Sequence, residues 1–132
     1  MSGFAEKLSK MKAFRSRKPA SVRQIEDAES ELGIIFADEY REYLLTYGAA
    51  SVFGHEFTGI SSNSRISVID VTIEERKLNN SCGNLYVTEQ TNTDGIVIWQ
   101  DSRGNVYKTQ PGTVAKKICS SLSEYLMFSD IC

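Results

Sequence analysis

Hydrophobic residues in the first half of the chain recur at the spacing of amphipathic helices. A first helix is predicted to follow Ser21, a good N-cap, and to close at Gly33, which suits the left-handed residue after a helix. A second is predicted to run from Asp38 to Gly48. Their apolar faces are Val22, Ile25, Ala28 and Leu32 in the first, and Phe36, Tyr40, Tyr43, Leu44 and Tyr47 in the second. Two helices joined by so short a connector predict an αα-hairpin.

The pattern changes to short strands and tight turns in the second half. Residues 85–90, 95–100 and 105–109 are apolar or partly alternating, and glycine-containing turns separate them. They predict a three-stranded antiparallel meander. Residues 52–53 and 57–60 predict two shorter strands broken by glycines.

Three further segments complete the prediction. Residues 71–78 predict a short helix capped by Asp70, and residues 114–118 either start a helix or form a linker. Ser121 to Glu124 fit a capping box that opens a last helix. The side chains expected to pack inward from it are Leu122, Tyr125 or Leu126, and Met127 or Phe128. The chain shows no internal repeat and no linker, so we expect one α+β domain.

The N-terminal segment, residues 1–20, is basic. It carries six cations and one acid, a net charge of +5, whereas residues 21–132 carry nine cations and sixteen acids, a net of −7. Its apolar residues recur at helical spacing: Phe4, Leu8, Met11 and Phe14. We expect a short helix and leader packed on the domain formed by residues 21–132; a nucleic-acid arm is the alternative.

Acidic residues are concentrated in residues 26–42, which hold seven carboxylates and one cation, Arg41. A field of this sign favours a basic partner and repels nucleic acid. The same pattern also fits two ordinary solvated helix faces.

The composition of the whole chain excludes several classes. With 132 residues, 41% hydrophobic, and a formal net charge of −2, it is a globular chain without the overall basic charge of a nucleic-acid coat. No apolar run approaches the roughly 20 residues of a membrane helix, and the start lacks the apolar core of a signal peptide. The three cysteines, Cys82, Cys119 and Cys132, have no paired spacing. We therefore expect a cytoplasmic protein with reduced thiols.

The sequence offers little for catalysis. His55 is the single histidine, and its neighbour Glu56 would point to the opposite face of a strand, so we expect a solvated or hydrogen-bonded turn histidine. Metal-ligand spacings and glycine-rich phosphate loops are missing, so neither a metal nor a cofactor is expected. Trp99 lies in an apolar run and is expected in the core. A site of paired carboxylates lacks any specific pattern.

Several segments together resemble the SUKH superfamily, the group that includes the yeast cell-wall assembly regulator. The resemblance rests on the helices and link in residues 25–48, on Phe53-Gly54 and Thr58-Gly59-Ile60, on Gly95–Trp99 with the turn Asp101–Asn105, and on Ser120–Phe128. It covers residues 21–128. Two positions depart from the family pattern: Ala37 stands where proline is usual, and Gln100 where an acid often follows the tryptophan.

This resemblance implies an α+β domain whose helices pack on a mainly antiparallel, curved sheet. It also implies a non-enzymatic immunity protein that binds and neutralises the C-terminal domain of a secreted toxin, often a nuclease. We expect the acidic surface to suit a basic nuclease, and the protein to be a monomer or weak dimer that binds no nucleic acid directly. The candidate partner-binding residues lie on turns and helix faces: Asp38, Glu39, Glu42, Glu56, Asp94 and Asp101.

Two alternatives stay open at this point. One is a regulatory scaffold of the cell-wall or signalling type that binds a cellular protein. The other is an enzyme with a carboxylate site.

Overall fold

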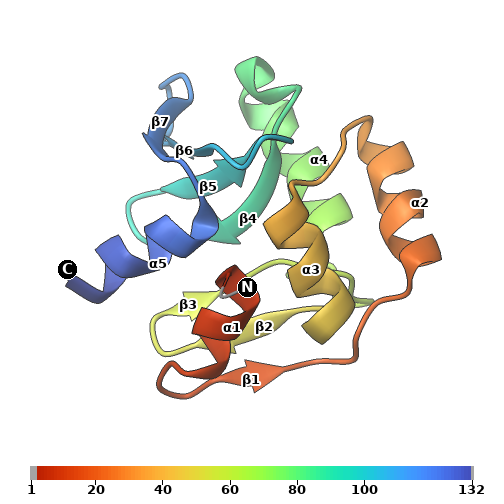
Figure 1. The fold of residues 1–132 in the computed structure, drawn as a ribbon. Coiled ribbons are helices and arrows are strands. Elements are labelled where there is room, and N and C mark those ends of the chain that lie inside the picture. The colour runs from red at the N-terminus through yellow and green to blue at the C-terminus, as the bar shows by residue number, and fades with distance from the viewer. Residues whose placement is uncertain (1–2, 132) are drawn as a thin grey trace.

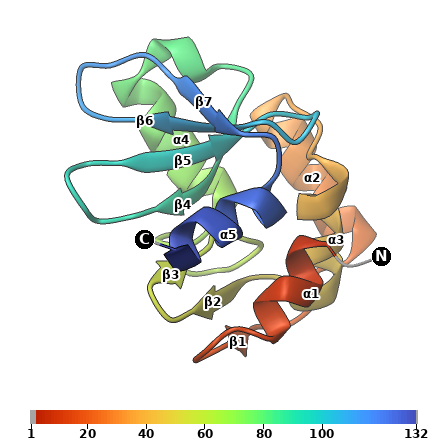
Figure 2. The same cartoon turned by 60° about the vertical axis from the view of Figure 1, so that its left-hand side comes forward.

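The computed structural model describes residues 3–131, and two antiparallel sheets with helices around them make up its architecture (Figures 1 and 2). The helices are α1 (Phe4–Ser9), α2 (Val22–Leu32), α3 (Asp38–Tyr47), α4 (Val68–Leu78) and α5 (Leu122–Ile131), with a 3₁₀ turn η1 (Asn80–Cys82) after α4. The strands are β1 (Arg15–Ser16), β2 (Ala50–Val52), β3 (His55–Glu56), β4 (Tyr86–Gln90), β5 (Val97–Gln100), β6 (Val106–Thr109) and β7 (Lys116–Cys119). The predicted α+β class is confirmed.

The two sheets lie one below the other in Figure 1, with the smaller sheet at the bottom. The smaller has the strand order β1-β2-β3 and the larger β4-β5-β6-β7. An isolated bridge between Phe57 and Glu89 joins them. The predicted meander is confirmed as β4, β5 and β6, and Trp99 on β5 is fully buried, as expected.

The αα-hairpin forms at the predicted residues. α2 has a capping box and a glycine stop, whereas α3 has no side-chain cap at its start, carries two acidic residues in its first turn and ends at a glycine. Ser21 Oγ accepts a hydrogen bond from Gln24 N at 3.1 Å, and Gln24 Oε1 accepts one from Ser21 N at 2.9 Å, which makes a capping box. Gly33 closes α2 in the left-handed conformation, at φ +67°. Gly48 follows α3 at φ +72°, and a Cβ there would lie 1.9 Å from Lys18 O.

The core between α3 and the sheets is rich in tyrosine, and each buried hydroxyl has partners. The Tyr40 hydroxyl lies 2.8 Å from Thr58 Oγ1, and the Tyr43 hydroxyl donates to Thr58 O at 2.7 Å. The Tyr86 hydroxyl donates to Gln100 Oε1 at 2.7 Å. Burial raises the pKa of all three phenols, so each stays neutral and hydrogen-bonded.

The N-terminal segment packs on the rest of the chain. Phe4 and Leu8 are fully buried, and the Phe4 ring packs edge-on against Phe57 at 5.1 Å between centroids. The Tyr47 hydroxyl donates to Ala5 O at 2.9 Å. After α1 the chain extends into β1, which pairs with β2, a strand that the helical spacing did not indicate. The division of the chain at residue 20 stays a prediction.

Two predictions that concern strands are wrong: one strand was missed, and one expected strand does not form. Residues 114–118 were expected to start a helix or form a linker, but Lys116–Cys119 pairs with β6 and covers the edge of the meander. Its two lysines are exposed, so the segment lacks the alternation typical of a half-buried strand. Residues 57–60 form only isolated bridges, Phe57 with Glu89 and Gly59 with Ser67. Gly59 lies so close to Gly48 that a Cβ would be 2.0 Å from its carbonyl oxygen, so this position requires glycine.

Two helix details also differ from the prediction. The helix expected at residues 71–78 begins at Val68, and Ser67, not Asp70, is its N-cap, with Asp70 N donating to Ser67 Oγ at 3.3 Å. In α5, Leu122 and Leu126 are buried as predicted, but Met127 is 56% exposed. The side chain of Phe128 lies outside the described residues, as does Cys132.

Candidate functional site

Exposed acidic side chains are concentrated on α2 and α3. We use the name acidic hairpin surface for their five exposed carboxylates, none of which forms an ion pair within residues 3–131: Glu26, Asp27, Glu31, Asp38 and Glu42. Figure 1 shows α2 at the margin of the molecule, where one face is free of the core.

The apolar positions of α2 explain why its acids point outward. Ile25, Ala28 and Leu32 are buried against the core, so the residues between them must face solvent. Glu29 is the exception. Its carboxylate accepts from Phe36 N at 2.9 Å and pairs with Arg41 at 3.2 Å, which ties α2 to the start of α3.

A shallow groove of about 670 Å³ adjoins this surface, between the end of α2 and the β5–β6 turn. Glu26 and Ile35 are among its lining residues, and Ile35 is 64% exposed. An exposed apolar side chain with polar and charged residues of both signs around it, including Arg103, is compatible with the apolar centre and polar rim of a protein interface.

Of the six predicted partner-binding residues, only Asp38 and Glu42 belong to the acidic hairpin surface. Asp94 is exposed in the β4–β5 turn, at φ +54°, on a different part of the molecule. The other three, Glu39, Glu56 and Asp101, have intramolecular roles. Their participation in partner binding stays a prediction.

Glu39 caps α5, although it lies on α3. Its carboxylate accepts from Leu122 N at 2.6 Å and Ser123 N at 3.3 Å, the first backbone amides of α5, and from Gln100 Nε2. Burial raises its pKa against the opposing effect of these hydrogen bonds. The family pattern often has an acid at the position of Gln100. In this chain the Gln100 side-chain amide instead donates a hydrogen bond to the Glu39 carboxylate on α3.

Asp101 organises the β5–β6 turn. Its carboxylate accepts from Arg103 N at 3.0 Å, Asn105 N at 2.9 Å and the Tyr107 hydroxyl at 3.0 Å. Burial opposes ionisation, but the hydrogen bonds, those from Asn105 and Tyr107 foremost, hold the pKa of Asp101 below its usual value. A carboxylate used in this way has little capacity left for a partner.

Glu56 lies on β3 and pairs with Arg65 from the loop before α4. The second bond of this bidentate pair, Arg65 Nη2 to Glu56 Oε2, measures 3.0 Å. Hydrogen bonding from Arg65 lowers the pKa of Glu56. This carboxylate therefore lies in a basic neighbourhood, apart from the acidic hairpin surface.

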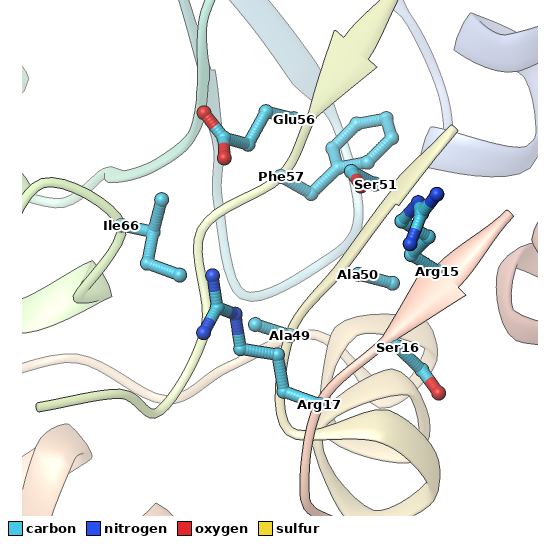
Figure 3. Close-up of a pocket in the computed structure, with 9 residues that line it drawn as sticks. All are labelled: Arg15, Ser16, Arg17, Ala49, Ala50, Ser51, Glu56, Phe57 and Ile66. Atoms are coloured by element: carbon cyan, nitrogen blue, oxygen red, sulfur yellow. The ribbon is translucent and has the colours of Figure 1, made fainter. Parts of the chain in front are cut away.

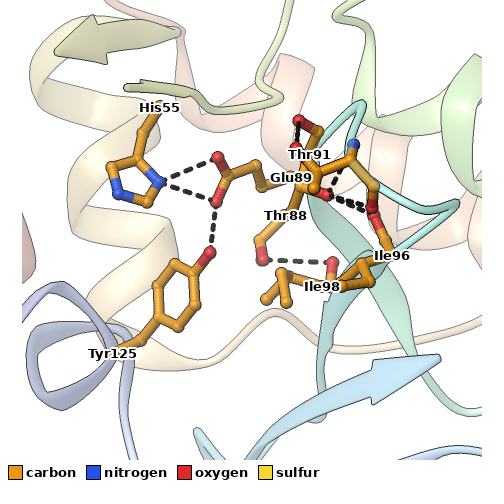
Figure 4. Close-up of polar contacts among 8 residues, drawn as sticks. His55, Thr88, Glu89, Thr91, Ile96, Ile98 and Tyr125 are labelled. Carbon is orange, nitrogen blue, oxygen red and sulfur yellow. Dashed lines mark hydrogen bonds and ion pairs between the residues drawn. The ribbon is translucent and has the colours of Figure 1, made fainter. Parts of the chain in front are cut away.

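A buried polar cluster that sequence reasoning missed joins β3, β4 and α5. Figure 4 shows His55 and Tyr125 meeting the Glu89 carboxylate from two sides, with His55 Nδ1 at 2.8 Å and the Tyr125 hydroxyl donating at 2.6 Å. His55 is hydrogen-bonded as expected, but by Glu89, 34 residues away, and not by its neighbour Glu56. A single glutamate in an apolar strand was the available signal.

Among the described residues, no group of three or more histidine, cysteine, aspartate or glutamate side chains is arranged to hold a metal ion. Nor does any helix within residues 3–131 have the length and apolar character needed to cross a membrane.

One family model matches the chain, SUKH_5, described as SMI1-KNR4 cell-wall, and it covers residues 1–128. The match therefore includes α1 and β1 as well as the hairpin and both sheets. No curated protein matches the chain.

Proposed function

The chain belongs to the SMI1-KNR4 cell-wall family, and from this membership we propose that it is an immunity protein that binds and neutralises a cognate secreted toxin. The proposed partner is the C-terminal domain of the toxin, a nuclease with a basic active surface. The chain acts by occluding that surface in the cytoplasm and performs no bond-making of its own. It does so as a monomer or weak dimer.

One observation carries the choice of surface: five carboxylates of α2 and α3 are exposed and lack ion-pair partners within residues 3–131. A nuclease must attract phosphate groups, so its active surface is basic. Carboxylates presented at that surface compete with the nucleic acid for the same cations and accelerate association. Ile35 adds an apolar contact that survives high salt.

The experiment that tests this proposal is co-expression with the product of the neighbouring reading frame, which is expected to be toxic on its own. Survival of the host and co-purification of a stoichiometric complex are the expected results. No complex and no protection would overturn the proposal.

Two charge-reversal substitutions test whether the acidic hairpin surface binds the toxin. Asp27→Lys with Glu31→Lys changes two exposed residues four positions apart on the same face of α2. The matched control, Glu6→Lys with Glu74→Lys, changes net charge equally on α1 and α4. We expect the α2 pair to weaken binding at least tenfold and to flatten its salt dependence, and the control to do neither. Glu39 is unsuitable for this purpose, since its reversal would also remove the cap of α5.

The family description itself favours a second candidate, a regulatory scaffold of the cell-wall type. Both candidates bind proteins, so the neighbouring gene separates them. A host that survives toxin expression only with the intact α2 surface supports the immunity protein. A complex with a host protein, without protection from any neighbouring gene product, supports the scaffold.

A further inference from the structure

The outer face of the smaller sheet brings arginines together around a hollow. The register pairs Arg15 with Ser51 and Ser51 with Glu56, so these three side chains form one row across β1, β2 and β3. Arg17 lies two residues beyond Arg15 and therefore on the same face. Figure 3 shows Arg15, Arg17 and Glu56 around this hollow.

Small side chains leave the space open. The hollow has a volume of about 350 Å³, and its lining residues include Ala49, Ala50 and Ser51. Arg65 pairs with Glu56 on one side. Arg15 and Arg17 are exposed and form no direct ion pair within residues 3–131, and Arg17 interacts with Glu56 only through longer-range electrostatics. Both guanidinium groups can therefore bind a carboxylate of a partner.

Within residues 3–131, the outer side of the β1 backbone forms no strand pairing. β1 is an edge strand, bonded only to β2. Arg17 N donates to Ala49 O at 2.9 Å, and the alternation of an antiparallel ladder then turns the N–H and C=O of Ser16 away from β2. An edge of this kind accepts an additional strand, and side chains at alternate positions give the specificity.

We propose that the β1 edge and the hollow receive an extended acidic segment of a partner protein. The segment adds as a strand beside β1, and carboxylates at alternate positions meet Arg15 and Arg17, which are about 7 Å apart along the strand. Each guanidinium fork suits a carboxylate. A polypeptide fits better than a nucleic acid, because the N–H and C=O of Ser16 at the β1 edge pair with the amides and carbonyls of a second peptide backbone, which a nucleic acid lacks.

This surface is separate from the acidic hairpin surface, so it is tested without a toxin. The probe is a fluorescein-labelled hexapeptide of alternating glutamate and valine, measured by anisotropy at low salt. The control peptide has glutamine in place of every glutamate. We expect saturable binding of the acidic peptide, and binding of the control at least tenfold weaker. Equal binding of the two peptides, or none of either, overturns the proposal.

Two protein variants and two modified peptides test the mode of binding. Arg15→Ala with Arg17→Ala should weaken binding at least tenfold, whereas the matched pair Lys10→Ala with Lys77→Ala, which removes the same charge elsewhere, should change it less than twofold. Two peptides are N-methylated at alternate amides, one at the odd and one at the even positions. Their affinities for the protein should differ, since only one of the two patterns blocks the amides that face β1. Equal affinity of these two peptides contradicts strand addition. An oligothymidylate of equal charge that binds more tightly, and depends on the same arginines, assigns the hollow to nucleic acid instead.

Discussion

Replacing Glu39 with alanine should lower the urea midpoint of unfolding, because this side chain caps a helix that begins 83 residues later. The substitution removes the acceptor of Leu122 N and Ser123 N, whereas Gln100 Nε2 keeps its bond to Gly104 O at 3.1 Å. Ser121, the residue before α5, still accepts from Glu124 N at 3.0 Å, so the loss of the acceptor for the first two amides of α5 is assigned about 1 kcal/mol, as for a helix cap. A hydrogen bond to a charged group contributes roughly 1.5–3 kcal/mol, which we discount because the carboxylate is partly exposed. We expect a total loss of about 2–3 kcal/mol, or a midpoint roughly 1–2 M lower in urea.

The assay is equilibrium unfolding followed by the fluorescence of Trp99, the single tryptophan, which is fully buried. Glu42→Ala is the control, since Glu42 lies one turn further along α3, is exposed and forms no ion pair within the described part of the chain. Its effect should stay within about 0.5 kcal/mol. Equal effects of the two substitutions, or a Glu39→Ala loss below that limit, would refute the capping role.

The contribution of Glu39 to the free energy of unfolding should depend on pH in a direction that follows from its pKa. Burial raises the pKa of Glu39 above its ordinary value of 4.5, so the folded state binds this proton more tightly than the unfolded state. The stability contributed by this linkage is complete below pH 4.5 and is lost as the pH rises through the folded pKa. As the pH is lowered from 7 to about 4.5, the free energy of unfolding of the wild type should therefore rise relative to that of Glu39→Gln. A difference that stays constant or moves the other way contradicts this reasoning.

Three other substitutions or reactions test separate parts of the fold. Gly48→Ala should destabilise the protein by roughly 3 kcal/mol or more, measured by thermal unfolding, because the new Cβ would lie 1.9 Å from Lys18 O at a positive φ. Tyr125→Phe should cost roughly 1.5–3 kcal/mol in urea, since the buried Glu89 carboxylate loses a donor; an unchanged midpoint would contradict this. Burial raises the pKa of Cys119 to about 11, so at pH 8 its thiol should react with a disulfide reagent about 100-fold more slowly than in the urea-unfolded chain, and equal rates would contradict its burial.

The helical hairpin could be predicted closely from the sequence because its signals are local. Ser21 and Gly33 act on residues within one turn of themselves, and the apolar spacing of α2 and α3 is independent of the rest of the chain. The strand β7 could not be predicted in this way. Its place depends on the open edge of β6, and its exposed lysines, Lys116 and Lys117, hide the alternation.

The candidate site shows a similar division between local and long-range information. The run of acids in residues 26–42 predicted where negative charge is concentrated, but not which carboxylates are free. Glu39 and Glu29 have partners on other elements, and a linear count of charges includes them equally with exposed residues such as Glu31. Assigning the free carboxylates requires the three-dimensional contacts of each one.

These contacts sharpen the electrostatic argument for binding. Glu29 and Glu39 are engaged in intramolecular contacts, which leaves five carboxylates on α2 and α3 without an ion pair among the described residues. Arg15 and Arg17, on and just after β1, likewise form no direct ion pair there. Charges of opposite sign on different elements give the molecule an electric dipole moment, so the field of a charged partner orients it. The formal net charge of −2 by itself has almost no orienting effect. A basic partner is therefore steered toward the hairpin during encounter. This orientation should weaken as salt rises, because the Debye length falls from about 10 Å at 0.1 M to about 3 Å at 1 M.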